Sequence, residues 1–220
     1  MDKIEYLSDI KIFAELSEAE QTSLARASCR KTLKPGMLVC PEGSRVQFLV
    51  IMLSGRASSI LVGENGDQVI LDFYVPGDII GEMSLSDDVF YMSNIITIKA
   101  SEVMFISRQA VLEVIRKDMQ LALDLAQVSA ERMNHLQARL CSLALENGPQ
   151  RIITFIRELA EKLGIEEPDG LFIDWNLSHQ TIASACGLTR ETVSRLIHNL
   201  TDKGMLTRER NGWKVCRNNF

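Results

Sequence analysis

The chain has 220 residues, of which 46% are hydrophobic and 24% are charged, a composition typical of a folded globular protein. This composition excludes a disordered chain, and no apolar run approaches the roughly 18 residues of a membrane-spanning helix. The charged N-terminus, Met1-Asp2-Lys3-Ile4-Glu5, has no apolar signal core behind it. We therefore expect a cytoplasmic protein with no membrane partner.

The net charge of −5 is unevenly distributed along the chain. Residues 178–220 hold seven Lys/Arg and three Asp/Glu, a net charge of +4, so residues 1–177 carry −9. An acidic body with a basic C-terminal segment is typical of a protein that contacts a polyanion at one end only.

The predicted elements begin with one or two short helices over residues 4–28, with Ser17 as a helix cap. From residue 31 to about 106, short β-branched or aromatic runs alternate with turn signals such as Val75-Pro76-Gly77-Asp78, which predicts an antiparallel sandwich or barrel. The expected strands are 37–40, 48–53, 57–62, 69–74, 95–99 and 103–106.

A long helix is expected after Ser107, because no glycine follows until Gly148 and the apolar period becomes helical. Its apolar seam has the 3,4 spacing of a coiled coil and favours a homodimer interface over packing on the chain's own barrel. The seam residues are Ala126, Ser129, Met133, Leu136, Leu140 and Leu143, of which the last four form the expected dimer contact. Gly148-Pro149 is expected to break this helix, and another begins at Arg151.

Residues 178–204 predict a helix-turn-helix. Ser178 caps a first helix from His179 to about Cys186, Gly187 permits the turn, and Thr189 caps a second helix from Arg190 to about Lys203.

The exposed face of the second helix carries Arg190, Glu191, Ser194 and Arg195. Arginine can donate to guanine O6 and N7, and glutamate can accept from cytosine N4, so this face can read G·C pairs in a major groove. Residues 205–215 then form two short strands around Asn211-Gly212. In this winged hairpin, Arg208, Arg210 and Lys214 are expected to neutralise DNA phosphates.

These motifs resemble the Crp/Fnr family of bacterial transcription regulators. The resemblance covers nearly the whole chain and rests on Gly77-Asp78-Ile79-Ile80-Gly81-Glu82 and on residues 188–196 (LTRETVSRL). It implies an α+β fold with an N-terminal antiparallel β-roll (1–107), a dimerisation helix (108–147) and a C-terminal winged helix-turn-helix (148–220).

The resemblance also implies double-stranded DNA and RNA polymerase as partners, and Thr189 as a further phosphate contact. The Arg190-Glu191-Arg195 set resembles that of members reading TGTGA-type half-sites, while Ser194 is shared with the Fnr branch and leaves a TTGA-like site open.

The β-roll departs from the cyclic-AMP-binding members of the family. Those members place an Arg-Ser or Arg-Thr pair about ten residues after Gly-Glu, whereas this chain has Gly81-Glu82 followed by Met92-Ser93. Residues 57–98 contain seven acids and no Lys or Arg, although Arg116, Lys117 or Arg132 of the long helix could reach the site. We therefore expect an unknown neutral or apolar effector rather than cyclic AMP, in a pocket formed by Gly81, Glu82, Met83, Met92, Ser93 and Met133.

Other functions remain as alternatives. The five cysteines are scattered without a C-x-x-C pair, which disfavours a disulfide framework and a zinc site but leaves thiol sensing open. Only Cys29 and Cys40 lie in the first hundred residues, too few to hold a four-cysteine cluster. Haem is also open, although no histidine precedes His135, and a third alternative is an effector-independent regulator whose roll is only a scaffold. A metal-dependent oxygenase would need histidines that the roll lacks, so we expect no catalytic residue, no metal and no identified cofactor.

Overall fold

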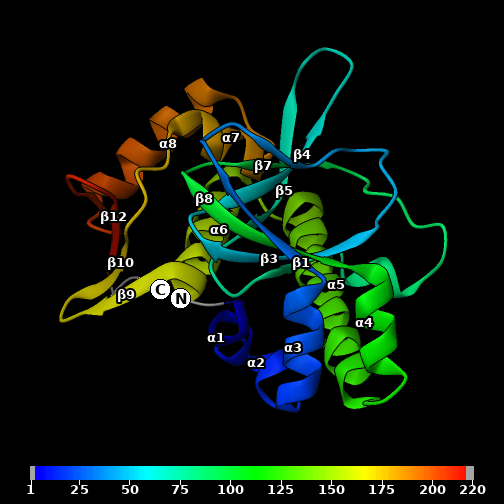
Figure 1. The fold of residues 1–220 in the computed structure, drawn as a ribbon. Helices are drawn as coiled ribbons and strands as arrows, with labels where there is room; N and C mark the ends of the chain where they lie inside the picture. The colour runs from blue at the N-terminus through cyan, green and yellow to red at the C-terminus, as the bar shows by residue number, and fades with distance from the viewer. Residues whose placement is uncertain (1–2, 217–220) are drawn as a thin grey trace. The chain divides into compact units, whose positions relative to one another are not determined.

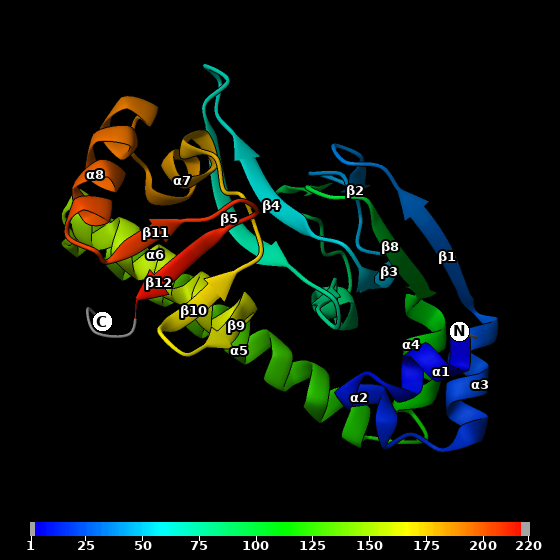
Figure 2. The same ribbon diagram turned by 90° about the vertical axis from the view of Figure 1, so that its left-hand side faces the viewer.

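The computed structural model describes residues 3–216 of the chain, which divides into two compact units. The first unit comprises residues 1–61 and 71–135, and the second comprises residues 62–70 and 136–220. Figures 1 and 2 show the fold from two sides. Within the described part of the chain, no helix is both long and apolar enough to cross a membrane.

Three short helices open the first unit: α1 (Lys3–Ser8), α2 (Lys11–Ala14) and α3 (Glu18–Arg26). Helix α3 begins where the sequence predicts, because the Ser17 hydroxyl accepts a hydrogen bond from the backbone N–H of Glu20. These helices pack with α4 (Arg108–Ile115) and the start of α5 (Gln120–Leu145) around a core in which Leu7, Phe13, Leu24, Leu121 and Leu125 are fully buried.

Two four-stranded sheets form the roll, in the orders β1-β8-β3-β6 and β2-β7-β4-β5. Strands of the first sheet pair antiparallel, as do β2 and β4 with β7 in the second. Side chains from both sheets, including Val50, Ala57 and Ile95, form one buried cluster between them. The predicted antiparallel roll is thereby confirmed. Its strands are β1 (Ser28–Leu33), β2 (Leu38–Cys40), β3 (Phe48–Ser54), β4 (Ala57–Val62), β5 (Gln68–Tyr74), β6 (Ile79–Ile80), β7 (Asn94–Thr97) and β8 (Ser101–Ser107).

The chain then forms the long helix α5 (Gln120–Leu145) and, after two residues, α6 (Gly148–Leu163). The sequence predicts that α6 starts at Arg151, but the structure includes Gly148-Pro149 in its first turn. The reason is a capping box in which Asn147 and Gln150 exchange side-chain and backbone hydrogen bonds, with proline at a first-turn position that needs no N–H.

The second unit contains a four-stranded sheet of order β11-β12-β10-β9, packed with α6, α7 (His179–Cys186) and α8 (Arg190–Asp202). Strands β11 (Leu206–Arg208) and β12 (Trp213–Cys216) are the predicted winged hairpin. The sequence analysis misses the hairpin of β9 (Gly164–Glu167) and β10 (Gly170–Ile173), which pairs with β12 and extends the wing into a sheet (Figure 2).

Candidate nucleic-acid interface and roll site

Local hydrogen bonds position the two helices of the predicted helix-turn-helix. The hydroxyl of Ser178 accepts from the N–H of Thr181 at 3.0 Å, and that of Thr189 accepts from the N–H of Thr192 at 3.2 Å, so each helix begins at its predicted cap. Gly187 between them has φ +61°, a left-handed conformation that favours glycine. Thr189, an expected phosphate contact, therefore uses its hydroxyl as a cap in the free protein.

Helix α8 buries one face and exposes the opposite one. Val193, Ile197 and Leu200 are buried against the second unit's core. The four expected base-reading residues are exposed and line one shallow depression, together with a fifth side chain, His198. His198 lies eight positions after Arg190, two helical turns further along, and its Nε2 is 3.5 Å from Asp202 Oδ2. Sequence reasoning missed His198, although this spacing would have placed it on the reading face.

A second depression lies between the start of α7 and the wing, lined by Ser178, His179, Gln180, Arg190 and Arg208 with Leu177. The Arg208 guanidinium lies 5.7 Å from the centre of the Trp213 ring. Burial lowers the pKa of His179, and the charges of Arg208 and Arg190 lower it further. The depression therefore has a positive field suited to an anion. Sequence reasoning missed His179 and Gln180, whose signal is their place in the first turn of a helix beside a basic hairpin.

The three expected wing cations differ in their surroundings. Arg208 and Arg210 are exposed. Lys214 instead pairs with two acids of the unpredicted β9–β10 hairpin: its Nζ lies 2.9 Å from Glu167 Oε2 and 3.7 Å from Asp169 Oδ2. The hydrogen bond to Glu167 is the main reason that the pKa of Lys214 is raised. The structure thus places the Lys214 ammonium in an ion pair with two carboxylates of the same chain.

In the roll, Gly81 and Glu82, two of the expected effector residues, form a tight corner. Gly81 has φ +84°, and a Cβ there would stand 2.6 Å from the carbonyl oxygen of Phe48 and 2.9 Å from the Tyr91 hydroxyl. Only glycine fits this corner. Glu82 then starts the short 3₁₀ helix η1 (Glu82–Leu85), with its side chain only 4% exposed.

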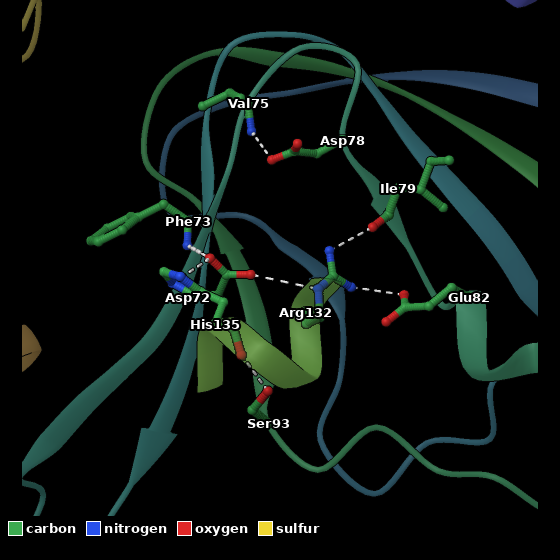
Figure 3. Close-up of polar contacts among 10 residues, drawn as sticks. Asp72, Phe73, Val75, Asp78, Ile79, Glu82, Ser93, Arg132 and His135 are labelled. Atoms are coloured by element: carbon green, nitrogen blue, oxygen red, sulfur yellow. Dashed lines mark hydrogen bonds and ion pairs between the residues drawn. The ribbon is translucent and has the colours of Figure 1, made fainter. Parts of the chain in front are cut away.

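Arg132 of α5 supplies a positive charge beside residues 57–98, which have none of their own (Figure 3). Its Nη1 donates to Glu82 Oε2 at 2.7 Å, and its Nη2 donates to the carbonyl oxygen of Ile79 at 2.8 Å. Its Nε lies 3.6 Å from Asp72 Oδ2, and the guanidinium lies 5.0 Å from the centre of the Tyr74 ring. We call Asp72, Tyr74, Ile79, Glu82 and Arg132 the Arg132 cluster. Burial lowers the pKa of Arg132, but the neighbouring Tyr74, Glu82 and Asp72 side chains outweigh it and raise that pKa.

The other expected effector residues fall into two groups. Ser93 is buried, and its hydroxyl lies 2.6 Å from that of Ser59. Met83, Met92 and Met133 are exposed by 39%, 77% and 58%. Position 92, where a cyclic-phosphate-binding roll would need an arginine, therefore carries a side chain that lies mostly in solvent.

The seam of α5 also separates into two faces. Met133, Leu136 and Leu140 are exposed by 58%, 42% and 67%. Leu143 is half-buried and faces Gly187 of the helix-turn-helix, 3.3 Å from the position of a Cβ on that glycine.

The described thiols differ in their exposure to solvent. Burial raises the pKa of Cys40 to about 11 and that of Cys186 to about 12, which disfavours the thiolate. Cys29 and Cys141 are exposed. Among residues 3–216, no group of three or more His, Cys, Asp or Glu side chains is arranged to hold a metal ion.

Comparisons with known proteins agree with the fold of the roll and with that of the helix-turn-helix. Residues 30–118 match the model of the cyclic nucleotide-binding domain, and residues 150–217 match that of the Crp-like helix-turn-helix domain. The cyclic AMP receptor protein of Thermus thermophilus is 27% identical over 188 residues, 85% of this chain and 84% of that protein. The global nitrogen regulator of Synechocystis is 27% identical over 169 residues, 75% of this chain and 74% of that protein. The structure of FixK2 from Bradyrhizobium japonicum has a TM-score of 0.77 at 22% identity, covering 86% of this chain and 92% of that one.

Proposed function

Because the chain belongs to the Crp/Fnr family of bacterial transcription regulators, we propose that it binds a palindromic DNA operator as a homodimer. The observation that carries the proposal is the exposed face of α8, on which Arg190, Glu191, Ser194 and Arg195 stand together. In this role α8 enters the major groove, Arg208 and Arg210 contact phosphates, and the protein acts in the cytoplasm with RNA polymerase as a partner. The roll has no catalytic task.

The homodimer is supported by the distribution of polar and apolar side chains on α5. After Leu125, the side chains that turn toward the chain's own body include Arg132 and His135, both half-buried. The large apolar side chains Met133, Leu136 and Leu140 lie in solvent instead. A helix that exposes its leucines and half-buries its arginine needs a second apolar surface, and an identical helix provides one with the 3,4 spacing of a coiled coil.

We propose half-sites of TGTGA or TTGA type. The arginine and glutamate side chains on α8 suit G·C pairs, and Ser194 suits either base set. The two α8 helices of a dimer reach successive major grooves about 34 Å apart.

The test is selection of duplexes from a random-sequence pool by the full-length protein, followed by fluorescence anisotropy on the selected duplex and on a scrambled duplex of the same composition. We expect a palindrome with one of these half-sites and a preference over the scrambled duplex of at least about 10³-fold. Selection of no palindrome, with equal binding to both duplexes, would contradict the proposal.

We further propose that cyclic AMP is not the effector. The mostly exposed Met92 offers no counter-charge to a cyclic phosphate, and the guanidinium of Arg132 is already shared by Glu82 and Asp72. The relatives do not decide this point, because their names include a cyclic AMP receptor, a nitrogen regulator and an anaerobic regulatory protein.

A further inference from the structure

The Arg132 cluster joins the long helix to the roll through one side chain. Arg132 belongs to α5, whereas its partners lie on β5, β6 and η1 (Figure 3). The contact between Arg132 and Glu82 spans 50 positions of the sequence. This side chain therefore ties the middle of α5 to three elements of the roll.

The guanidinium of Arg132 has an acceptor at each of its three nitrogens. Nη1 meets Glu82, Nη2 meets the carbonyl of Ile79, and Nε faces Asp72. The side chains of Glu82 and Asp72 are only 4% and 13% exposed, so water solvates these carboxylates poorly and Arg132 is their main source of compensating charge. His135, one helical turn along α5, adds a second α5 side chain near Asp72, with Nε2 3.9 Å from Oδ1.

A controlling ligand acts by contacting two elements better in one conformation than in another. Arg132 makes such contacts from within the chain, between the helix with the proposed dimer face and three elements of the roll. Because it is covalently attached, it does not pay the loss of translational freedom that a free ligand pays on binding. An entering anion would meet two carboxylates and one arginine, and would have to compete with both carboxylates for that arginine.

We propose that Arg132 is a built-in ligand of the roll, which holds α5 in the orientation for operator binding so that the protein needs no small-molecule effector. The inference rests on the proposed DNA-binding function and concerns its control. Arg132 is a positioning residue in this proposal, since it touches no DNA. In this proposal the roll keeps the fold of a sensor domain, and the Arg132 guanidinium occupies the position beside Glu82 that an effector would otherwise use.

The experiment measures operator affinity in a double-mutant cycle of Arg132→Gln, Glu82→Gln and the double variant, with Arg116→Gln as the matched control. Arg116 is an exposed arginine at the end of α4, so its substitution removes the same charge outside the Arg132 cluster. The wild-type protein is dialysed and shown by mass spectrometry to carry no small molecule. Binding to the selected operator and to the scrambled duplex is measured by anisotropy, with and without a metabolite extract.

We expect the ligand-free wild type to bind its operator with an affinity that the extract does not change. Arg132→Gln and Glu82→Gln each weaken operator binding by about 5- to 150-fold, the double variant is no weaker than the weaker single variant, and Arg116→Gln has no effect. Binding to the scrambled duplex stays within about twofold throughout, because it depends on phosphate contacts alone. If Arg132→Gln does not fold, Arg132→Lys replaces it in the cycle, since a single ammonium cannot reach all three acceptors.

Two outcomes overturn the inference and leave the proposed function intact: operator binding by Arg132→Gln at wild-type strength, or wild-type binding that appears only with the extract. A wild type that never prefers operator over scrambled duplex, with or without the extract, overturns the proposed function and the inference together. The three patterns are distinct in the same assay.

Discussion

His179 couples protonation to the proposed contact between the protein and a DNA phosphate. Burial and the charges of Arg208 and Arg190 lower its pKa in the free protein. A phosphate in the depression beside it cancels part of this positive field and favours the protonated imidazole. Binding therefore takes up a proton, and we expect operator affinity to rise as the pH falls from about 8 to about 6, by less than tenfold per pH unit.

The measurement is operator affinity against pH for the wild type, His179→Gln and His198→Gln. His198 is the control, because it is a second histidine of the second unit and lies on the exposed face of α8 beside Asp202. The slope should disappear in His179→Gln and persist in His198→Gln; the reverse result would assign the proton to His198. In the absence of DNA, the lowered pKa of His179 affects the stability of the folded protein, which decreases as the pH falls. The free protein has its full stability above the unfolded value near 6.5 and loses some of it as the pH falls through the folded pKa.

Substitution of an arginine on α8 and of an arginine on the wing should affect DNA affinity differently. Arg195→Ala removes a contact to one base pair, so we expect a cost of about 1–3 kcal/mol on the operator and little change on scrambled DNA. Arg208→Ala removes a phosphate contact, so both duplexes should weaken alike and the salt slope should fall by about one unit per subunit.

Lys214→Ala is the informative third variant in the same measurements. Because Lys214 is paired with Glu167 and Asp169, we expect its removal to change the salt slope much less than the removal of Arg208. Equal loss on operator and scrambled DNA for Arg195→Ala would take that residue out of base reading. A Lys214→Ala slope that matches Arg208→Ala would show that the ion pair opens on DNA.

The residues that could be predicted from sequence are those whose placement is local. Ser178, Gly187 and Thr189 act within a few positions of themselves, and the period of α8 then decides which side chains are exposed. Arg132 could be named only as one of three candidates, because its partner Glu82 is 50 positions away and no local rule selects among the cations after the roll. The ion pair of Lys214 was missed for the same reason.

At the scale of elements, the sequence pattern predicts six strands of the roll and the two wing strands, but it misses β1, β6, β9 and β10. Strand β1 carries Arg30 and Lys31 at the edge of its sheet, where charge is expected but apolar alternation is weak. Strands β9 and β10 form a short hairpin whose Glu166 and Glu167 look like loop residues in sequence. Their hairpin is held by pairing with β12, a contact that residues 164–173 cannot reveal by themselves.

The exposed face of α5 makes a prediction that belongs to the helix as a whole. Leu140→Glu places a charge in the proposed seam, where two copies would meet at low dielectric, so we expect it to convert the dimer into a monomer. Gln137→Glu is the matched control, because it adds the same charge at a neighbouring exposed position of α5. Sedimentation equilibrium at micromolar concentration should give a dimer for the wild type and Gln137→Glu. A monomeric wild type, both free and on DNA, would contradict the dimer.

At the scale of the whole molecule, the order of roll, long helix and winged helix-turn-helix followed from the sequence because each part has its own period and turn chemistry. The uneven charge of the chain also has a structural meaning. The positive field gathers around the start of α7 and the wing, while Asp72 and Glu82 of the roll face the half-buried Arg132. The molecule therefore attracts a polyanion with one part and disfavours a small anion in another.

This charge arrangement predicts that the protein does not respond to cyclic AMP. A cyclic phosphate without a dedicated arginine forgoes a charge-assisted hydrogen bond worth roughly 1.5–3 kcal/mol, or about one to two decades of affinity. Calorimetry should detect no binding of cyclic AMP at micromolar concentration. Adenosine, which lacks the phosphate, is the control ligand and should bind no more weakly than cyclic AMP.

Met92→Arg tests the cause of this expected lack of response. The corner at Gly81 and Glu82 is intact, so a new arginine at position 92 should restore some cyclic AMP binding without improving that of adenosine. Recovery should be partial, because Glu82 stays paired with Arg132 and is less able to accept from a ribose hydroxyl. Micromolar binding of cyclic AMP to the native protein, together with stronger operator binding, would mean that Arg132 leaves its carboxylates for the phosphate. That exchange of partners would make Arg132 the receptor of the effector and not its replacement.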